Sequence, residues 1–485
     1  MKLRGKLAEL MVLIEPKLYR EYVRYPNGQA ELYVRMTKAL YGMLKSALWF
    51  YQKLRDDLEA DGFVINDYDP CVANKLVNGT QMTVTWHVDD LKVSHKDQAA
   101  IDKFAQFLRD KFEKPEQGLM LTYHEGKIHD YLGIDLDYSE KKKLKVSMIP
   151  YIDKILTGFP EEIGNPVADP AADHLFTVRD DGHDQYLSEE KAQQFHTTVA
   201  QLLFLCNRAR RDIQVAVAFL TTRVKKPDID DWGKLRRVLK YLKGTKYMKL
   251  TLTIDDLTTI KWWVDASDRT HHDCKGHTGS MMSLGGGAIV SSSTKHKINT
   301  KSSTESELVT LDDALPMILW CLYFIEAQGY TVEQNVVFQD NQSTMRLAVN
   351  GSLSSSKRTK HIKARYYFAK DRIDEGEMDV RYCPTTEMWS DMLNKAKHGT
   401  PFKRDRAMLM NVPLAYDNEL EFKNTHPALL TKGANLADIE TQESNAPSRS
   451  VLGDIENVSP HRRASENKYE VSWAGIVRGD SVPEK

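Results

Sequence analysis

The stretch Thr83-Val84-Thr85-Trp86-His87-Val88-Asp89-Asp90-Leu91-Lys92-Val93 decides the fold of the first half of the chain. Apolar and polar residues alternate up to Val88, which is the period of a strand with one buried face. Two aspartates interrupt this pattern, and the alternation then resumes at Leu91 and Val93. The pattern predicts a hairpin with Asp89 and Asp90 at its tip, where a metal ion could reach their carboxylates. An ordinary acidic turn is the alternative, because Asp is common in turns.

The composition limits the class of protein. The chain has 485 residues, enough for two or three domains, and its 41% hydrophobic and 28% charged residues are typical of a globular protein. The net charge of −1 shows no overall basic bias, so a nucleic-acid surface would have to be local. There is no run of 18 apolar residues and no signal-peptide pattern, so we expect no membrane association. Five scattered cysteines without metal-binding spacing indicate reduced thiols in an intracellular protein, in a cytoplasmic particle or the nucleus.

Helices and further strands around the hairpin predict an α+β layer. Apolar residues recur at helical spacing over 44–58, and Gly62 marks the C-terminal end of that helix. A second amphipathic helix is predicted at 101–112, with strands near 128–137 and 143–149. A helical layer on antiparallel strands fits a palm-like arrangement.

Short motifs around this layer follow one another in a characteristic order. They are Leu40-Tyr41-Gly42, Gly62-Phe63, Asp69-Pro70-Cys71, Tyr131-Leu132-Gly133 and Tyr241-Leu242-Lys243-Gly244-Thr245. With Val88-Asp89-Asp90 among them, they resemble the reverse transcriptase of copia-type LTR retrotransposons. The resemblance implies that Asp89 and Asp90 are the second catalytic carboxylate motif of the palm and ligands of its metal ions. The family usually has Tyr where this chain has His87.

The same family has another catalytic Asp on an earlier strand. Two metal ions bridged by carboxylates are needed for nucleotide transfer. Before Asp56, this chain has four carboxylates, none of which lies in the family's strand-end context: Glu9, Glu15, Glu21 and Glu31. We therefore expect the fingers and the first catalytic Asp to be missing and the polymerase activity to be lost, unless other Pol segments supply the motif.

A basic region follows a stretch that is typical of a linker. Residues 157–187 are rich in Pro, Gly, Asp and Glu, and residues 188–250 are predicted to be helical. Between Arg208 and Lys249, 13 Lys or Arg stand against four Asp, an excess of nine positive charges. This surface is either a solvated helix face or a surface that follows phosphates, and the family resemblance favours a primer–template handle. The candidate nucleic-acid-binding residues are Arg236, Arg237, Lys240 and Lys243.

A second set of carboxylates lies further along the chain. Asp265 follows a predicted strand, Glu307 lies in the first turns of a long predicted helix, and Asp340 follows another strand. Two strands within 280–292, joined by three glycines, are predicted to form a hairpin. Asp391 begins a short helix near the end of this region.

This order is similar to the ribonuclease H domain of the same copia-type elements. The matching stretches are Val264-Asp265-Ala266, Ser303-Thr304-Glu305-Ser306-Glu307, Asp340-Asn341-Gln342-Ser343, Arg358-Thr359-Lys360-His361-Ile362 and Asp391-Met392-Leu393. The resemblance implies that Asp265, Glu307, Asp340 and Asp391 form the metal-binding quartet. It also implies a mixed five-stranded sheet with helices on both faces. Mg²⁺ prefers carboxylate oxygens, and two such ions can hold a phosphate and activate water for in-line attack.

The carboxylates also have structural alternatives. Asp265 and Asp340 could be turn formers, and Asp391 could cap its helix. Thr304 and Glu307 could form a capping box, in which Glu307 bonds to the helix N-terminus and Glu305 competes for the catalytic role. We favour Glu307, from its place in the family motif.

Two further features of this region bear on function. The basic run from Lys357 to Arg372 is either a solvated helix face or a grip for the hybrid backbone, with Arg358, Lys360 and Lys363 as candidate nucleic-acid-binding residues. Pro316 lies within the helix of Glu307 and should kink it or cost a backbone hydrogen bond.

We therefore expect a segment of a copia-type Pol polyprotein: an α+β reverse-transcriptase palm fragment followed by an α/β ribonuclease H-like domain. The expected parts are a truncated palm (1–156), a linker (157–187), a basic helical, thumb-like connection (188–250), a ribonuclease H-like domain (251–400) and a polar, disordered tail (401–485). The expected activity is Mg²⁺-dependent cleavage of RNA in RNA–DNA hybrids, with Mn²⁺ as an alternative ion and hybrid or primer–template nucleic acid as the partner. The competing hypothesis is a non-catalytic nucleic-acid-binding relic of a retroelement.

Overall fold

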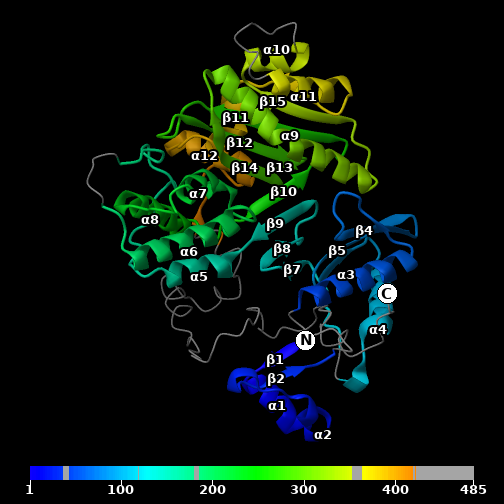
Figure 1. The fold of residues 1–485 in the computed structure, drawn as a ribbon. Coiled ribbons are helices and arrows are strands. Elements are labelled where there is room, and N and C mark those ends of the chain that lie inside the picture. The colour runs from blue at the N-terminus through cyan, green and yellow to red at the C-terminus, as the bar shows by residue number, and fades with distance from the viewer. Residues whose placement is uncertain (36–42, 118–119, 180–184, 352–362, 419–420, 422–485) are drawn as a thin grey trace, which may run out of the picture. The chain divides into compact units, whose positions relative to one another are not determined.

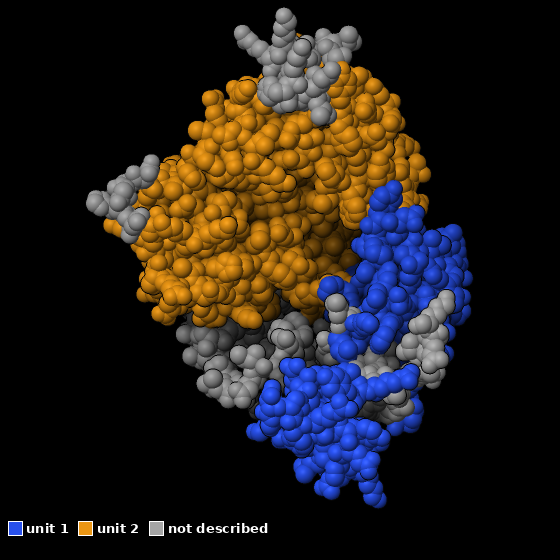
Figure 2. Space-filling model, in the orientation of Figure 1, with its two compact units in different colours: residues 1–125, 465–485 blue, residues 126–464 orange. Residues whose placement is uncertain are grey.

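The computed structural model describes residues 1–35, 43–117, 120–179, 185–351, 363–418 and 421. They form two compact units, which Figure 2 shows in different colours. The described part of the first unit is Met1–Glu125, and the second unit begins at Gly126. The expected palm region, 1–156, is therefore divided between the two units. The motif at 40–42 and the tail beyond residue 421 lie outside the described residues.

The first unit contains a small N-terminal layer. Strand β1 (Lys2–Arg4) pairs antiparallel with β2 (Glu31–Tyr33), and helices α1 (Lys6–Ile14) and α2 (Pro16–Tyr19) lie between them in the sequence. Their buried core consists of Leu3, Ala8, Ala30 and Leu32.

The predicted hairpin belongs to a four-stranded antiparallel sheet with the order β3-β4-β5-β6. Its strands are β3 (Val64–Ile65), β4 (Val72–Val77), β5 (Thr80–His87) and β6 (Asp90–Ser94). Helices α3 (Leu44–Ala60) and α4 (Gln98–Phe112) share one core with this sheet. Met82, Val84 and Trp86, the apolar half of the alternating stretch, are buried in that core, which confirms the predicted strand period.

The strands predicted at 128–149 form part of a different sheet, in the second unit. Its order is β13-β10-β9-β8-β7, all antiparallel. The strands are β7 (Ile128–Tyr131), β8 (Ile134–Asp137), β9 (Lys143–Ser147), β10 (Leu250–Ile254) and β13 (Gly285–Gly286). Two of the three glycines predicted as a simple hairpin turn thus pair with β10. Strand β10 also pairs with β9, where Leu250 lies opposite Val146, and local sequence patterns do not reveal a pairing of segments so far apart.

The expected linker and basic connection pack together as one layer. The helices are α5 (Ile149–Gly158), α6 (Glu189–Cys206), α7 (Gln214–Thr221) and α8 (Ile229–Gly244). In the 157–187 stretch, Ala171 and Leu175 are almost fully buried in the core of these helices. The prediction of a free linker was therefore wrong for its described residues, because a few apolar side chains among Pro, Gly and Asp anchor the segment.

The ribonuclease H-like part contains a mixed five-stranded sheet with the order β14-β12-β11-β15-β16. Its strands are β11 (Thr259–Ser267), β12 (Lys275–Ser283), β14 (Val290–Asn299), β15 (Gln334–Gln339) and β16 (Asp379–Tyr382). The first three pair antiparallel, whereas β15 runs parallel to β11 and β16 parallel to β15. The predicted mixed sheet is confirmed.

Helices cover both faces of this sheet. One core joins it to α9 (Ser303–Ala327), α10 (Gln342–Asn350) and α11 (Lys363–Asp374), and Figure 1 shows α9 lying across the strands. On the other face, Trp263 and Met281 belong to the core that contains α5–α8. The connection and the ribonuclease H-like part therefore share one continuous core and do not form separate domains.

The helix of Glu307 continues through its proline. Pro316 lies in the middle of α9, and its side chain is exposed. By length and composition α9 could cross a membrane, although the sequence has no uninterrupted apolar run of that length. Half of its most apolar window is buried inside the protein.

The end of the described chain corrects the predicted start of the tail. Helix α12 (Gly399–Met410) buries Phe402, Leu409 and Met410 in the shared core. Residues 401–410 of this helix were assigned to the polar tail, because four charged residues, 403–406, follow Phe402. Short 3₁₀ helices complete the described elements: η1 (Arg20–Tyr22), η2 (Pro26–Gly28), η3 (Pro115–Gln117), η4 (Arg211–Ile213), η7 (Thr385–Glu387) and η8 (Trp389–Leu393).

Candidate metal centre

Three of the predicted carboxylates meet at one edge of the mixed sheet. Asp265 lies near the end of β11, and Asp340 directly follows β15. These strands are parallel neighbours with Trp263 opposite Phe338, so their carboxyl ends reach the same edge. Glu307, in the second turn of α9, joins them, and one oxygen of each carboxylate lies within 4.8 Å of the others. Among the described residues, this is the only group of three or more potential metal ligands with such spacing.

The structure separates Glu307 from the helix cap. Ser302 is the N-cap of α9, and its hydroxyl accepts a hydrogen bond from the Glu305 amide at 3.2 Å. The Glu305 carboxylate accepts from the Lys301 amide at 2.9 Å. The alternative of a capping box from Thr304 to Glu307 is therefore wrong. Glu307 instead accepts a long hydrogen bond of 3.4 Å from the Gln339 amide.

Asp391 lies on the 3₁₀ helix η8 and is linked to Asp265 through Lys395. Lys395 contacts both carboxylates, with its ammonium nitrogen 3.0 Å from Asp265 Oδ2 and a close ion pair to Asp391. Asn394 donates to the same Asp265 oxygen at 2.8 Å, and Lys397 Nζ lies 2.6 Å from Asp391 Oδ2. The fourth predicted carboxylate is thus near the cluster, with lysine ammonium groups beside it.

Three of these contacts were not predicted from the sequence. Asn394, Lys395 and Gln339 lie next to the family motifs but not within them. The spacing of Lys395, four residues after Asp391, was the available signal, because side chains four apart can meet on a helical turn.

Burial and like charges change the acidity of the cluster. Burial, with Asp391 beside it, raises the pKa of Asp265 to about 7 against the opposing effect of Lys395. Burial raises the pKa of Glu307 well above its usual range, and the charges of Asp265 and Asp340 add to the rise. Burial opposes ionisation of Asp391 as well, but a hydrogen bond with Asp265 and the ammonium of Lys395 lower its pKa. Crowded carboxylates of this kind gain stability when a cation binds between them.

The donor set fits a hard divalent cation. Asp265, Glu307 and Asp340 offer only carboxylate oxygens, which Mg²⁺ and Mn²⁺ accept as ligands. The two most buried of them, Asp265 and Glu307, have 1% and 6% of their surface exposed, so water compensates their charge poorly. Asp340 also accepts a hydrogen bond of 2.9 Å from the Thr385 hydroxyl, which orients its carboxylate.

Asp89 and Asp90 lie at the predicted hairpin tip, in the first unit. His87 pairs with Asp90 across the turn, so Val88 and Asp89 are its two central residues. Val88 has φ +55°, a left-handed conformation that is strained for a β-branched residue. The two carboxylates are partly exposed and do not belong to a described group of three potential ligands.

Most of the predicted nucleic-acid-binding residues on α8 bind the adjacent 157–187 segment. Arg236 donates to the Glu162 carbonyl at 2.9 Å, Arg237 to the Ala171 carbonyl at 3.0 Å, and Lys243 to the Gly164 carbonyl at 3.3 Å. These side chains attach the 157–187 segment to α8, a structural role that the count of basic residues did not reveal.

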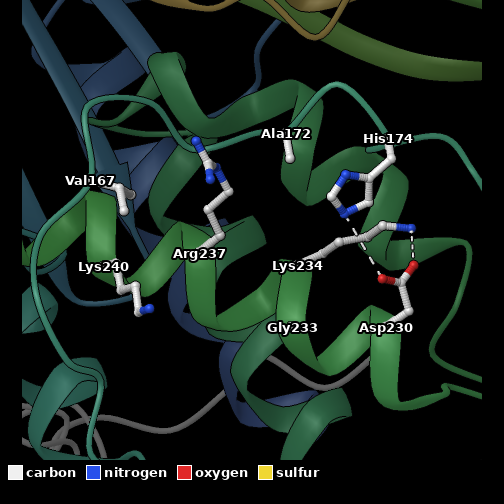
Figure 3. Close-up of a pocket in the computed structure, with 8 residues that line it drawn as sticks. All are labelled: Val167, Ala172, His174, Asp230, Gly233, Lys234, Arg237 and Lys240. Carbon is white, nitrogen blue, oxygen red and sulfur yellow. Dashed lines mark ion pairs between the residues drawn. The ribbon is translucent and has the colours of Figure 1, made fainter.

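A pocket of about 280 Å³ lies between α8 and this segment, and Figure 3 shows its lining. Lys240 and Arg237 line one end, while His174 and Lys234 lie beside Asp230 at the other. Lys234 Nζ lies 2.8 Å from Asp230 Oδ2, and Arg237 pairs with Asp169 at 2.5 Å.

Of the predicted basic residues near ribonuclease H motifs, Arg358 and Lys360 lie outside the described part of the chain, as does the side chain of Lys363.

Comparisons with known proteins agree with the sequence resemblance. Residues 10–172 match the family described as reverse transcriptase (RNA-dependent DNA polymerase). The retrovirus-related Pol polyprotein from transposon TNT 1-94 of Nicotiana tabacum is 26% identical over 404 residues, which cover 81% of this chain and 29% of that protein. The corresponding polyprotein from transposon RE2 of Arabidopsis thaliana is 26% identical over 402 residues, with 81% and 26% covered. This chain thus spans less than a third of the length of either relative.

A solved structure, LC11-RNase H1 from compost, overlaps 28% of this chain and 93% of its own length, at 14% identity and a TM-score of 0.22. At that score the overlap carries no argument, and the ribonuclease H-like description follows from the strand order given above. The matches confirm the resemblance seen in the sequence: the chain is a relative of the Pol polyproteins of copia-type retrotransposons, with a reverse transcriptase match over residues 10–172.

Proposed function

We propose that this chain cleaves the RNA strand of RNA–DNA hybrids in a reaction that depends on Mg²⁺, or on Mn²⁺ in its place. One observation carries the proposal: Asp265, Glu307 and Asp340, from three separate elements, bring carboxylate oxygens within 4.8 Å of one another. Burying like charges together destabilises a fold unless a cation or a proton compensates them. A divalent ion would compensate the charge of the three carboxylates and could also take part in phosphate cleavage.

The roles of the chain's residues follow from their positions. Asp265 is central, because it is grouped with Glu307 and Asp340 and also shares the Lys395 ammonium with Asp391. Asp265, Glu307 and Asp340 would hold one ion, and Asp265 and Asp391 would hold a second. When bound, two such ions stabilise the charge that develops on the scissile phosphate. Asn394 and Thr385 orient the Asp265 and Asp340 carboxylates through their hydrogen bonds.

Polymerase activity belongs to the relatives, and we propose that this chain does not extend a primer by itself. Asp89 and Asp90 provide two carboxylates, and the sequence before Asp56 contains no further Asp. Nucleotide transfer with two metal ions needs an additional bridging carboxylate, which another Pol segment would have to supply. Nucleotide incorporation on a primed RNA template by the purified chain would contradict this.

The binding partner under this proposal is an RNA–DNA hybrid or primer–template. Lys240 lines the α8 pocket and makes no hydrogen bond or ion pair with the part of the chain that the structure describes, so its ammonium is available to a backbone phosphate. Arg236, Arg237 and Lys243 already hold the neighbouring segment, and their contribution to phosphate binding is smaller.

A non-catalytic binding relic is the second candidate, and one observation favours it. Lys395 places a positive charge between Asp265 and Asp391, which compensates part of the cluster without a metal ion. Such a protein would bind hybrids but not cleave them.

End-labelled RNA in an RNA–DNA hybrid tests the proposal directly. The chain is incubated with Mg²⁺ beside Asp265→Asn, which preserves size but removes the charge, and both proteins are checked by circular dichroism. We expect cleavage by the wild type and a loss of at least about 100-fold in the variant. Hybrid binding without cleavage by the folded wild type would favour the relic.

A further inference from the structure

The candidate centre rests on a row of three residues that crosses the mixed sheet. Asp265 on β11 is paired with Gly279 on β12, and Gly279 is paired with Ser293 on β14. The 3₁₀ helix η8, which carries Asp391, lies over this row. Asn394 contacts Asp265, and Ser293 donates a hydrogen bond of 2.5 Å to the Leu393 carbonyl.

Gly279 allows η8 to lie directly on the sheet. A Cβ atom at this position would lie 2.7 Å from the Ser390 carbonyl oxygen and 3.1 Å from Leu393 Cβ. A side chain of any size would therefore lift η8 from β12. At the other end of η8, Trp389 stacks on Trp263 with ring centroids 4.3 Å apart.

A buried series of hydrogen bonds connects two histidines to Ser293. His271 and His277 have ring nitrogens 2.9 Å apart, and the other nitrogen of His277 lies 2.8 Å from the Ser293 hydroxyl. Both rings are buried, and Phe176 packs against them. This network lies outside the carboxylate cluster.

The Leu393 carbonyl, which ends this series of hydrogen bonds, determines which atom donates in each of them. The Leu393 carbonyl can only accept, so Ser293 uses its single hydroxyl hydrogen there. His277 Nε2 must then donate to Ser293, and His277 Nδ1 must accept from His271 Nε2. His277 is therefore neutral, because a second proton, on its Nδ1, would face the N–H group of His271 Nε2. Burial lowers the pKa of His271 to about 4 and that of His277 well below its usual range, in agreement with this assignment.

We propose that His277 and Ser293 are positioning residues, which hold η8 so that Asp391 reaches the second metal ion beside Asp265. The proposal rests on the proposed function for its metal ion, but it assigns a role that neither residue's position in the family motifs implies. A 3₁₀ helix of five residues has little internal stability, so its place is set by external contacts. One such contact is the hydrogen bond that the Ser293 hydroxyl donates to the Leu393 carbonyl, at the end of η8. Losing it should displace Asp391 and leave Asp265, Glu307 and Asp340 in place.

The test compares Ser293→Ala, which lacks the hydroxyl, with Ser293→Thr, which keeps it. Ser292→Ala is the matched control, because Ser292 is the neighbour on the same strand and its hydroxyl makes no hydrogen bond with the described residues. Mn²⁺ binding to each full-length protein is titrated by electron paramagnetic resonance. We expect two ions on the wild type, and a loss of roughly 10- to 100-fold in the affinity of one of them in Ser293→Ala. The other ion should bind unchanged, and Ser293→Thr should restore both.

Nuclear magnetic resonance provides a readout that needs neither metal nor activity. The ¹⁵N shifts of His277 should report a neutral ring with hydrogen on Nε2, and the Leu393 carbonyl ¹³C shift should move in Ser293→Ala and return in Ser293→Thr. A folded Ser293→Ala protein that binds both ions like the wild type would overturn the proposal, as would a His277 ring with hydrogen on Nδ1. A wild type that binds no Mn²⁺ would instead refute the proposed function, and the proposed role of Asp391 with it.

Discussion

Glu307 has the least compensated charge in the candidate centre. Its carboxylate is buried beside Asp265 and Asp340, and it accepts a weak hydrogen bond from the Gln339 side-chain amide. An acid whose pKa is raised in the folded state keeps protons that the unfolded chain releases. Its contribution to stability is complete below the pKa of the unfolded chain and is lost as the pH rises towards the folded pKa. Without metal, the protein should therefore lose stability as the pH rises from about 4, the ordinary carboxyl pKa, to about 7, the pKa of Asp265.

Replacing Glu307 by Gln tests this at a single residue. With a chelator at pH 8, Glu307→Gln should raise the melting temperature by roughly 2–4 °C, the effect of about 1 kcal/mol in domains of 150–250 residues. Adding Mn²⁺ should raise the melting temperature of the wild type more than that of the variant, which keeps only the ligands of the second ion. Differential scanning fluorimetry at pH 5 and pH 8 measures both effects. A variant that melts lower than the wild type at pH 8 without metal would show that the cluster is not under charge repulsion.

Lys395 has the opposite effect on the same carboxylates. Its ammonium group lies between Asp265 and Asp391, where it competes with any cation for their oxygens. Lys395→Ala should therefore bind Mn²⁺ more tightly, by about tenfold, while its metal-free form becomes less stable because buried carboxylates lose a counter-charge. Isothermal titration calorimetry gives the affinity, with Lys403→Ala on the exposed face of α12 as a control. Weaker Mn²⁺ binding in Lys395→Ala would indicate that the lysine supports the site.

At the scale of the elements, local patterns predicted the strands and helices that carry the site. The alternation up to Trp86 predicted β5, and the strand ending near Asp265 and the helix of Glu307 were also recognised. What the sequence did not reveal is pairing over long distances. Gly285 and Gly286 pair with β10, and the 157–187 stretch packs on α8, because these contacts depend on residues far apart in the chain. The sequence alone could not decide between Glu305 and Glu307 as the cluster residue. The structure decides it, because Ser302 is the N-cap of α9 and Glu305 bonds to the backbone beside that cap.

Helix α9 contains the clearest conflict between local preference and the fold. Pro316 removes one backbone hydrogen bond and crowds the preceding turn, at a cost of about 3 kcal/mol in a helix interior. The helix nevertheless continues to Ala327, since its buried face packs against the sheet on both sides of the proline. Pro316→Ala should therefore stabilise the protein, by about 1 kcal/mol or more, and leave metal binding unchanged. Thermal unfolding followed by circular dichroism measures the change, and a lower melting temperature would mean that the proline is needed for the packing of α9.

At the scale of the whole molecule, the expected division at residue 250 cuts through a single core. Strand β10 begins at Leu250 and pairs with β9, and Trp263 and Leu393 pack in the core that contains α6–α8. A fragment of residues 126–418 should therefore unfold cooperatively, whereas a fragment of residues 251–418 should not. Circular dichroism melts of the two fragments provide the comparison. Cooperative unfolding of the shorter fragment, at the temperature of the longer one, would restore the ribonuclease H-like part as an independent domain.

The central claim is that Asp265, Glu307 and Asp340 together bind a divalent ion. Anomalous diffraction from crystals of the chain soaked in Mn²⁺ tests it most directly, because the ion is located without reference to activity. We predict an anomalous peak between these three carboxylates, and its loss in Glu307→Gln crystals treated in the same way. Wild-type crystals that take up Mn²⁺ elsewhere but show no peak between the three carboxylates would contradict the claim.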